Sequence, residues 1–175
     1  MTVTHEPRLP FDPIDRAGVL WESHFGESSQ MKVITSVMRA QQLLLAELDQ
    51  RLKPFDITFA RYEVLVLLTF SKRKSLPLSK IGERLMVHPT SVTNAIQRLE
   101  AQGLVQRLTD PEDGRRTLAT LTPEGRRLTK KATKVLMDAD FALTGLSPDE
   151  EVALYGLLRQ FRASAGDFPY DGEVT

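Results

Sequence analysis

Apolar residues recur every three to four positions along most of the chain, which predicts a mainly helical protein. A short helix is predicted from about Ile14 to Phe25, and a long one from about Ser29 to Leu52. Five further helices are expected. The first begins near Thr58, the second is marked by Leu78, Ile81 and Leu85, and the third opens at Pro89. The last two run from about Pro123 to Leu143 and from Pro148 to about Ala163.

Residues that favour helix ends mark several of these boundaries. Thr58 is a good N-cap, and Pro89 and Pro123 suit the first helical position, where the missing N–H has no partner to lose. Gly103 suits the position just after a helix. The segment SPDE at Ser147–Glu150 has the pattern of a capping box, in which Ser147 and Glu150 satisfy each other's backbone N–H groups.

The hydrophobic spacing changes after Gly103. The stretches LVQRLT and RTLATLT predict two short strands, and DPEDG between them contains the Asp, Pro and Gly that favour a turn. The sequence therefore predicts a β-hairpin whose charged tip carries Gly114, Arg115 and Arg116.

The helix that opens at Pro89 has two unlike faces. Val92, Ala95, Ile96 and Leu99 form an apolar stripe that suits a core. The other side chains donate and accept hydrogen bonds, and these are Thr90, Ser91, Thr93, Asn94, Gln97 and Arg98. A merely solvated helix would be richer in Glu and Lys, whereas Asn, Gln and Arg can bond base edges in pairs of hydrogen bonds. The polar residues of this face therefore favour a helix that contacts DNA bases.

Two helices joined by a tight turn and followed by a β-ribbon form a winged helix-turn-helix, whose second helix enters the major groove. The residues expected to contact DNA are Pro89, Thr90, Ser91, Thr93, Asn94, Gln97, Arg98, Lys80, Arg115 and Arg116. Arg115 at the hairpin tip suits a narrow minor groove. For Arg116 the alternative is a salt bridge to Asp110 or Asp113. Phosphate contact and plain solvation are equally open for Lys72, Arg73, Lys74 and Lys80.

The predicted fold class is mainly α with a small β-wing, a winged helix-turn-helix flanked by N- and C-terminal dimerisation helices. The expected division is a flexible arm at 1–12, N-terminal dimerisation helices at 13–54, a DNA-binding domain at 55–122, C-terminal dimerisation helices at 123–165 and a tail at 166–175. A dimer is expected because a monomer would leave several apolar residues poorly covered, namely Leu146, Val152, Leu154, Leu157, Leu158 and Phe161. Packing of these helices within one chain is the alternative.

The charge is unevenly distributed, although the 175 residues have no net charge. Residues 72–116 contain nine basic and five acidic residues, a net charge of +4, whereas residues 138–175 contain two basic and eight acidic residues, a net charge of −6. The basic middle of the chain is therefore the place where an anionic partner is expected to bind.

Composition excludes several classes of protein and site. The chain has no cysteine, which excludes disulfides, thiolate metal sites and thiol-based redox sensing. The three histidines, His5, His24 and His88, lie far apart, so no metal site and no cofactor is expected. No apolar run approaches the roughly 18 residues of a membrane span, and the start MTVTHEPRLPFDP lacks the features of a secretory signal. The expected location is the cytoplasm.

No pattern of catalytic residues supports an enzyme. The segment SKRK at Ser71–Lys74 matches S-x-x-K, but it lies in a polar break and lacks the accompanying motifs of acyl enzymes. There is no nucleophile elbow, phosphate loop or dinucleotide fingerprint. The expected function is binding, and the alternative to a ligand-controlled regulator is an architectural or protein-interaction winged helix that senses no ligand.

The combination of SVTNAIQRLEAQGLV, DPEDGRR and LTPEG resembles the MarR family of bacterial transcription regulators, and the resemblance extends from about Ile14 to Ala163. It implies a homodimer with interlocked terminal helices and two winged lobes on a pseudo-palindromic operator. It also implies a small-molecule pocket between the dimerisation helices and each lobe, with DNA released on ligand binding. Such a protein acts as a repressor, or as an activator where the operator position favours it.

The resemblance also bears on the effector. A urate- and purine-responsive branch has an extra N-terminal helix with a tryptophan, which Trp21 matches, and an arginine entering the wing, which Arg107 matches. That branch has an Asp where this chain has Glu63, and an Arg where it has Ala95, which argues against an anionic purine. A small aromatic or phenolic effector is expected instead. The expected pocket residues are Trp21, His24, Arg39, Gln42, Tyr62 and Glu63.

Overall fold

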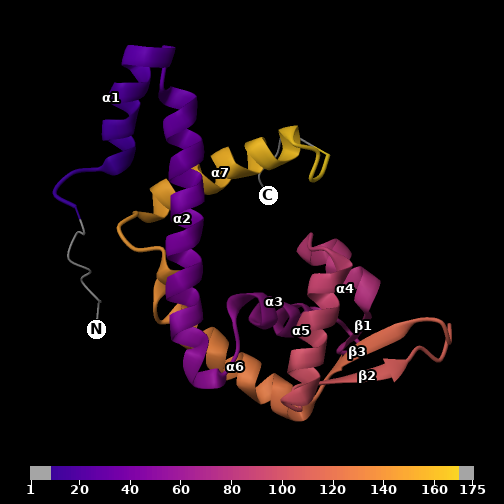
Figure 1. Ribbon diagram of the computed structural model, residues 1–175. Coiled ribbons are helices and arrows are strands. Elements are labelled where there is room, and N and C mark those ends of the chain that lie inside the picture. The colour runs from indigo at the N-terminus through magenta and orange to yellow at the C-terminus, as the bar shows by residue number, and fades with distance from the viewer. Residues whose placement is uncertain (1–8, 170–175) are drawn as a thin grey trace.

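The computed structural model describes residues 9–169 and is mostly helical with one small antiparallel sheet (Figure 1). Its elements in chain order are α1 Pro13–Phe25, α2 Ser29–Leu52, the 3-10 turn η1 Lys53–Phe55, α3 Phe59–Phe70, β1 Ser75–Pro77, α4 Leu78–Leu85, α5 Pro89–Ala101, β2 Val105–Thr109, β3 Thr117–Leu121, α6 Pro123–Met137, η2 Asp140–Ala142 and α7 Pro148–Ser164. The prediction of a mainly α fold with a small β-wing is confirmed. Within the described residues, no helix is long and apolar enough to span a membrane.

Most predicted helix boundaries are confirmed, and the capping residues explain them. Proline occupies the first turn of α5, α6 and α7, and Gly103 follows α5 with a φ of 71°. Thr122 caps α6 through a 2.9 Å bond from the Gly125 N–H. Ser147 and Glu150 form the predicted capping box of α7.

Thr58 occupies the N-cap position of α3, as predicted, but its side chain does not make the capping hydrogen bond. The hydroxyl of Thr58 accepts no backbone N–H from the first turn of the helix. The carboxylate of Asp49 on α2 accepts the Phe59 N–H at 2.6 Å instead. The first turn of α3 is thus tied to the last turns of α2, ten residues earlier in the chain.

Two predictions about the elements were wrong. The sixth helix does not continue to Leu143 but ends at Met137, and a turn follows in which Asp140, Phe141 and Ala142 have positive φ angles of 48°, 49° and 63°. The sheet also has a third strand that was not predicted, β1, which lies in the polar break before α4.

The sheet has the strand order β1-β3-β2, and both pairings are antiparallel. Val105 pairs with Leu121 and Thr109 with Thr117, while Ser75 pairs with Thr120. Ala119 and Leu121 on the central strand are buried, so the base of the hairpin belongs to the core and its far end extends from it as the wing (Figure 1).

The core lies in the lobe formed by α3, α4, α5 and the sheet, and it includes α6 and the end of α2. Its fully buried large residues are Leu52, Leu65, Leu68, Ile81, Ile96, Leu99 and Leu136. Burying one Leu or Ile side chain stabilises the fold by about 1.5–3 kcal/mol. The lobe is therefore a unit whose core does not need α1 or α7, and neither helix contributes to that core.

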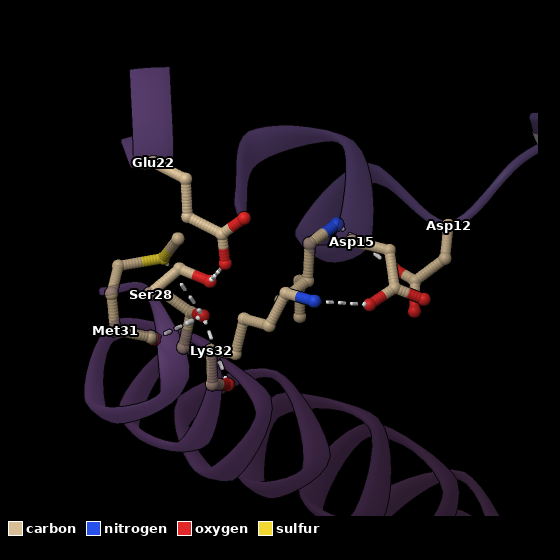
Figure 2. A network of polar contacts seen from close by, with 8 residues as sticks. Asp12, Asp15, Glu22, Ser28, Met31 and Lys32 are labelled. Atoms are coloured by element: carbon tan, nitrogen blue, oxygen red, sulfur yellow. Dashed lines mark hydrogen bonds and ion pairs between the residues drawn. The ribbon is translucent and has the colours of Figure 1, made fainter. Parts of the chain in front are cut away.

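Helix α1 packs against the start of α2 through a small polar network (Figure 2). The ammonium of Lys32 lies 3.0 Å from the carboxylate of Asp15, and this bond raises the pKa of Lys32. The buried hydroxyl of Ser28 donates to Glu22 at 2.6 Å. Gly18 leaves space for the Lys32 side chain to cross α1, so the two helices form a hairpin at the end of α2 away from α3 (Figure 1).

The described part of the chain leaves a large apolar surface on its terminal helices. The six residues predicted to be poorly covered in a monomer are all exposed, with Leu157 at 67% and Phe161 at 63%. Helix α7 buries none of its residues. Further exposed apolar residues lie on α1 and the first half of α2, and these are Val19, Leu20, Phe25, Val33, Ile34 and Met38.

Candidate nucleic-acid interface

The turn between α4 and α5 fixes the angle at which α5 is presented. Met86 ends α4 in the left-handed region with a φ of 54°, and the N–H of Val87 donates to the carbonyl of Gly82 at 3.0 Å. A side chain at Gly82 would crowd the Val87 carbonyl and Val92. The ring nitrogen Nδ1 of His88 then accepts the Thr90 N–H at 3.2 Å and caps α5. The two helices thus form a close helix-turn-helix.

Helix α5 has a buried apolar face and an exposed polar face, as its sequence pattern predicts. Val92, Ile96 and Leu99 are 2%, 0% and 0% exposed, and Ala95 is partly buried. The seven α5 residues expected to contact DNA are all exposed, and these are Pro89, Thr90, Ser91, Thr93, Asn94, Gln97 and Arg98. The hydroxyl of Thr93 also donates to the Pro89 carbonyl at 3.1 Å, which holds it close to the helix. The polar face is therefore available to a ligand as large as a duplex.

Asp113 organises the tip of the wing. Its carboxylate accepts the Arg115 N–H at 3.1 Å and also forms an ion pair of 3.1 Å with Nε of Arg116. The structure thus selects Asp113 over Asp110 as the partner of Arg116. Asp110 instead accepts the Glu112 N–H at 2.9 Å and stabilises the turn. Among residues 9–169 no side-chain bond engages the exposed guanidinium of Arg115, which leaves it free to reach a partner.

The remaining basic residues of the lobe differ in their surroundings. Lys80 forms an exposed ion pair of 2.7 Å with Glu83 on α4. Arg73 pairs with Glu112 at 3.1 Å and so connects the loop before β1 to the wing. Lys74 is neither a free phosphate contact nor a solvated charge, because its ammonium donates to the carbonyl of Thr69. Its backbone is in the left-handed region, with a φ of 54°. Lys74 therefore closes the end of α3.

The single chain does not bring the six expected ligand-pocket residues together. Trp21 and His24 lie on α1, at the end of α2 away from α3 (Figure 1), and the rings of Trp21 and Phe25 meet at a tilt of 54° with their centroids 4.9 Å apart. Arg39 and Gln42 lie on α2 and bond each other at 3.1 Å.

Tyr62 and Glu63 lie on α3 in different environments. Tyr62 is a core residue, only 5% exposed, and its hydroxyl lies 3.0 Å from that of Thr133. Glu63 faces outward, but desolvation by its surroundings raises the pKa of its carboxyl.

A hollow that was not predicted from the sequence lies between the start of α3 and the middle of α5. Its polar lining residues are Asp56, Thr58, Arg61, Asn94, Arg98 and Gln102. Asn94 and Arg98 were predicted to contact DNA, whereas Arg61 and Gln102 come from helix ends that fold together only in the tertiary structure. No cluster of metal-binding side chains occurs among the described residues.

Comparison with known proteins identifies the family. A model of the MarR family matches residues 59–117, which span α3 to the start of β3. The chain is 54% identical to Sco5413, a MarR family transcriptional regulator from Streptomyces coelicolor, over 81% of this chain and 98% of that one, with a TM-score of 0.75.

Two further relatives are more distant. The organic hydroperoxide resistance transcriptional regulator of Bacillus subtilis is 32% identical over 64% of this chain and 80% of its own length. BpsR of Bordetella bronchiseptica, whose DNA binding is regulated by 6-hydroxynicotinic acid, is 31% identical over 79% of this chain and 95% of its own, with a TM-score of 0.69. The chain belongs to the MarR family and is a DNA-binding transcription regulator, not an enzyme.

Proposed function

We propose that the protein is a homodimeric repressor whose two lobes bind the half-sites of a pseudo-palindromic operator. The observation that carries the proposal is the exposed hydrogen-bonding face of α5 beside a wing with a free arginine. In this proposal the N-terminal residues of α5 read base edges in the major groove, while Arg115 enters the adjacent minor groove. Lys80 and Arg116 contact phosphates when they leave their present ion pairs.

The dimer is supported by the uncovered apolar faces of α7, α1 and α2. A soluble monomer seldom exposes so many neighbouring apolar side chains, and a second copy would cover them with the same surface. The segments 13–54 and 123–165 are accordingly assigned to dimerisation, and 55–122 to DNA binding.

The test is selection of bound duplexes from a random pool by the purified protein at one fixed salt concentration. The expected result is a pseudo-palindrome whose half-site centres lie about one helical turn apart, ~10 base pairs. No enriched sequence even at low salt would contradict the proposal and favour a protein-interaction winged helix. Binding should also weaken steeply as salt rises, because each phosphate contact releases counterions.

Release of DNA by a small molecule is the second part of the proposal. An aromatic or phenolic effector fits the family resemblance, and the similarity to BpsR makes aromatic carboxylic acids a first panel to test. The six expected pocket residues are proposed to approach such a ligand only in the dimer, and these are Trp21, His24, Arg39, Gln42, Tyr62 and Glu63. Titration of the panel against the protein–operator complex tests this; an architectural winged helix would keep its affinity with every compound.

A further inference from the structure

Two arginines converge on the hollow between α3 and α5. The hollow is open to solvent and has a volume of about 580 Å³. Arg61 reaches it from the first turn of α3, and Arg98 from the outer face of α5. Asn94, one turn before Arg98, lies on the same wall. The hollow is therefore continuous with the surface proposed to read DNA.

Neither guanidinium is neutralised within the described chain. Arg61 donates to the carbonyl of Asp56 at 3.1 Å and to the hydroxyl of Thr58 at 3.3 Å, and neither acceptor carries a charge. Arg98 has no side-chain partner among residues 9–169. Two other arginines of the lobe are paired, since Arg107 lies 2.6 Å from Glu100 and Arg116 lies 3.1 Å from Asp113. The two arginines of the hollow are thus available to a ligand anion.

The one carboxylate in the hollow is already engaged. The side-chain amide of Gln102 donates to Oδ2 of Asp56 at 2.8 Å and to its carbonyl at 2.7 Å. Asp56 has a φ of 55°, so the turn before α3 is held in a conformation that directs both acceptors toward the end of α5. This contact joins the turn before α3 to the end of α5, the two helices that carry Arg61 and Arg98.

We propose that the hollow binds a backbone phosphate of operator DNA between Arg61 and Arg98. Guanidinium groups form paired hydrogen bonds with phosphate oxygens and keep their charge at every physiological pH. A free small anion in so open a site would remain largely solvated, whereas a duplex brings many contacts at once. The inference rests on the proposed function, and it adds Arg61 to the DNA-contacting residues as a phosphate contact outside the helix-turn-helix.

The experiment uses the full chain and its selected operator. Arg61→Ala is expected to weaken binding about tenfold per half-site and to reduce the salt dependence by about one phosphate per half-site, with the ranking of operator sequences unchanged. Lys131→Ala is the control, because Lys131 is an exposed cation on α6 and its removal changes the net charge equally. Arg61→Lys should recover part of the affinity, since it keeps the charge but loses the planar fork.

Methylphosphonate substitution of one phosphate at a time locates the contact. At one position per half-site the neutral linkage should weaken the wild-type protein but have little further effect on Arg61→Ala. Arg98→Ala, which loses no bond within the described chain, should show the same pattern at the same phosphate. If Arg61→Ala does not fold, this variant alone tests whether the hollow contacts a phosphate.

Two results would overturn the inference. One is that both variants keep the affinity and the salt dependence of the wild type. The other is that every methylphosphonate weakens the variants as much as it weakens the wild type. If the wild-type protein itself selects no sequence, the proposed function has failed rather than the assignment of the hollow.

Discussion

Glu100 near the end of α5 binds Arg107 on β2, with Oε2 of the carboxylate 2.6 Å from Nε of the guanidinium. The other carboxylate oxygen accepts the Arg107 N–H at 3.2 Å. The pair therefore links the proposed recognition helix directly to the first strand of the wing. Arg107 is the residue that matches an arginine of the purine-responsive branch, and here an internal carboxylate engages it.

Removal of this pair should weaken the lobe only slightly. Both side chains are partly exposed, so Arg107→Ala is expected to lower the free energy of unfolding by no more than about 1 kcal/mol. Urea unfolding measures the change. Lys134→Ala, which removes the exposed ion pair to Asp138 at the end of α6, is the control and should have a still smaller effect. A loss of several kcal/mol would mean that the pair fixes the wing on the lobe.

The two arginines at the wing tip should differ in their contribution to DNA binding. Arg115→Ala is expected to reduce operator affinity about tenfold per half-site, or ~1.4 kcal/mol, because its guanidinium is free to enter the minor groove. Arg116→Ala should reduce it less, since Asp113 already engages that side chain. Fluorescence anisotropy with labelled operator compares the two. Equal losses would show that the Asp113 pair opens when DNA binds.

Gly125 should tolerate no side chain. A Cβ at this position would collide with the main-chain carbonyl of Leu104, which cannot move without shifting the entry to β2. Gly125→Ala is expected to lower the free energy of unfolding by about 1–3 kcal/mol. Gly114→Ala at the wing tip meets nothing within 4 Å and serves as the control in the same unfolding experiment. Similar stability of both variants would show that α6 shifts to make room.

Stability should depend on pH through Glu63 in the opposite sense to Glu83. Desolvation raises the pKa of Glu63 above 4.5, so the folded state disfavours its carboxylate, and stability is lost as the pH rises through the raised value. Glu63→Gln should therefore raise Tm near neutral pH, and this gain should shrink as the pH falls from about 7 to about 4.

Glu83 provides the comparison for that measurement. The bond from Lys80 lowers the pKa of its carboxyl, so the pair stabilises the fold above pH 4.5 and less below it. Glu83→Gln should slightly lower Tm near neutral pH and have no effect in acid. The same sign for both variants at neutral pH would contradict the assigned environment of Glu63.

The apolar face of α7 should be required for association. Leu157 is 67% exposed in the single chain and lies on the face of α7 that is proposed to be covered by a partner. Leu157→Glu would bury a charge there. We expect sedimentation to show a monomer, with the lobe still folded. Operator affinity should fall because the dimer is lost. Gln160→Glu adds the same charge at an already polar position of α7. A dimeric Leu157→Glu protein would move the interface elsewhere.

Local patterns predicted most of this fold, because they act over a few residues. The periodicity of α2 and α5, the prolines that open α5 to α7 and the capping box at Ser147 all require only neighbouring residues. The exposure of the polar face of α5 follows from the same spacing. The partner of Arg116 stayed open between two aspartates, and the turn geometry of the wing decides it in favour of Asp113.

The features that were missed depend on contacts between distant segments. Strand β1 has only three residues, and its pairing with β3 joins Ser75 to Thr120, so no local alternation reveals it. The cap of α3 is supplied by Asp49 on another helix. The hollow beside α5 likewise requires Arg61 and Arg98 from separate helices, which explains why only the second was predicted.

The bond between Asp49 and the Phe59 N–H has a mechanical consequence. It couples α2 to the lobe at one end, while most of the exposed apolar residues of α2 lie in its other half, and these are Val33, Ile34, Val37 and Met38. A helix of 24 residues is about 36 Å long, so a tilt of about 5° at one end displaces the other by ~3 Å. Helix α2 is thus a lever, and a small angular change where two copies meet becomes a displacement of each lobe comparable to the rise of one base pair.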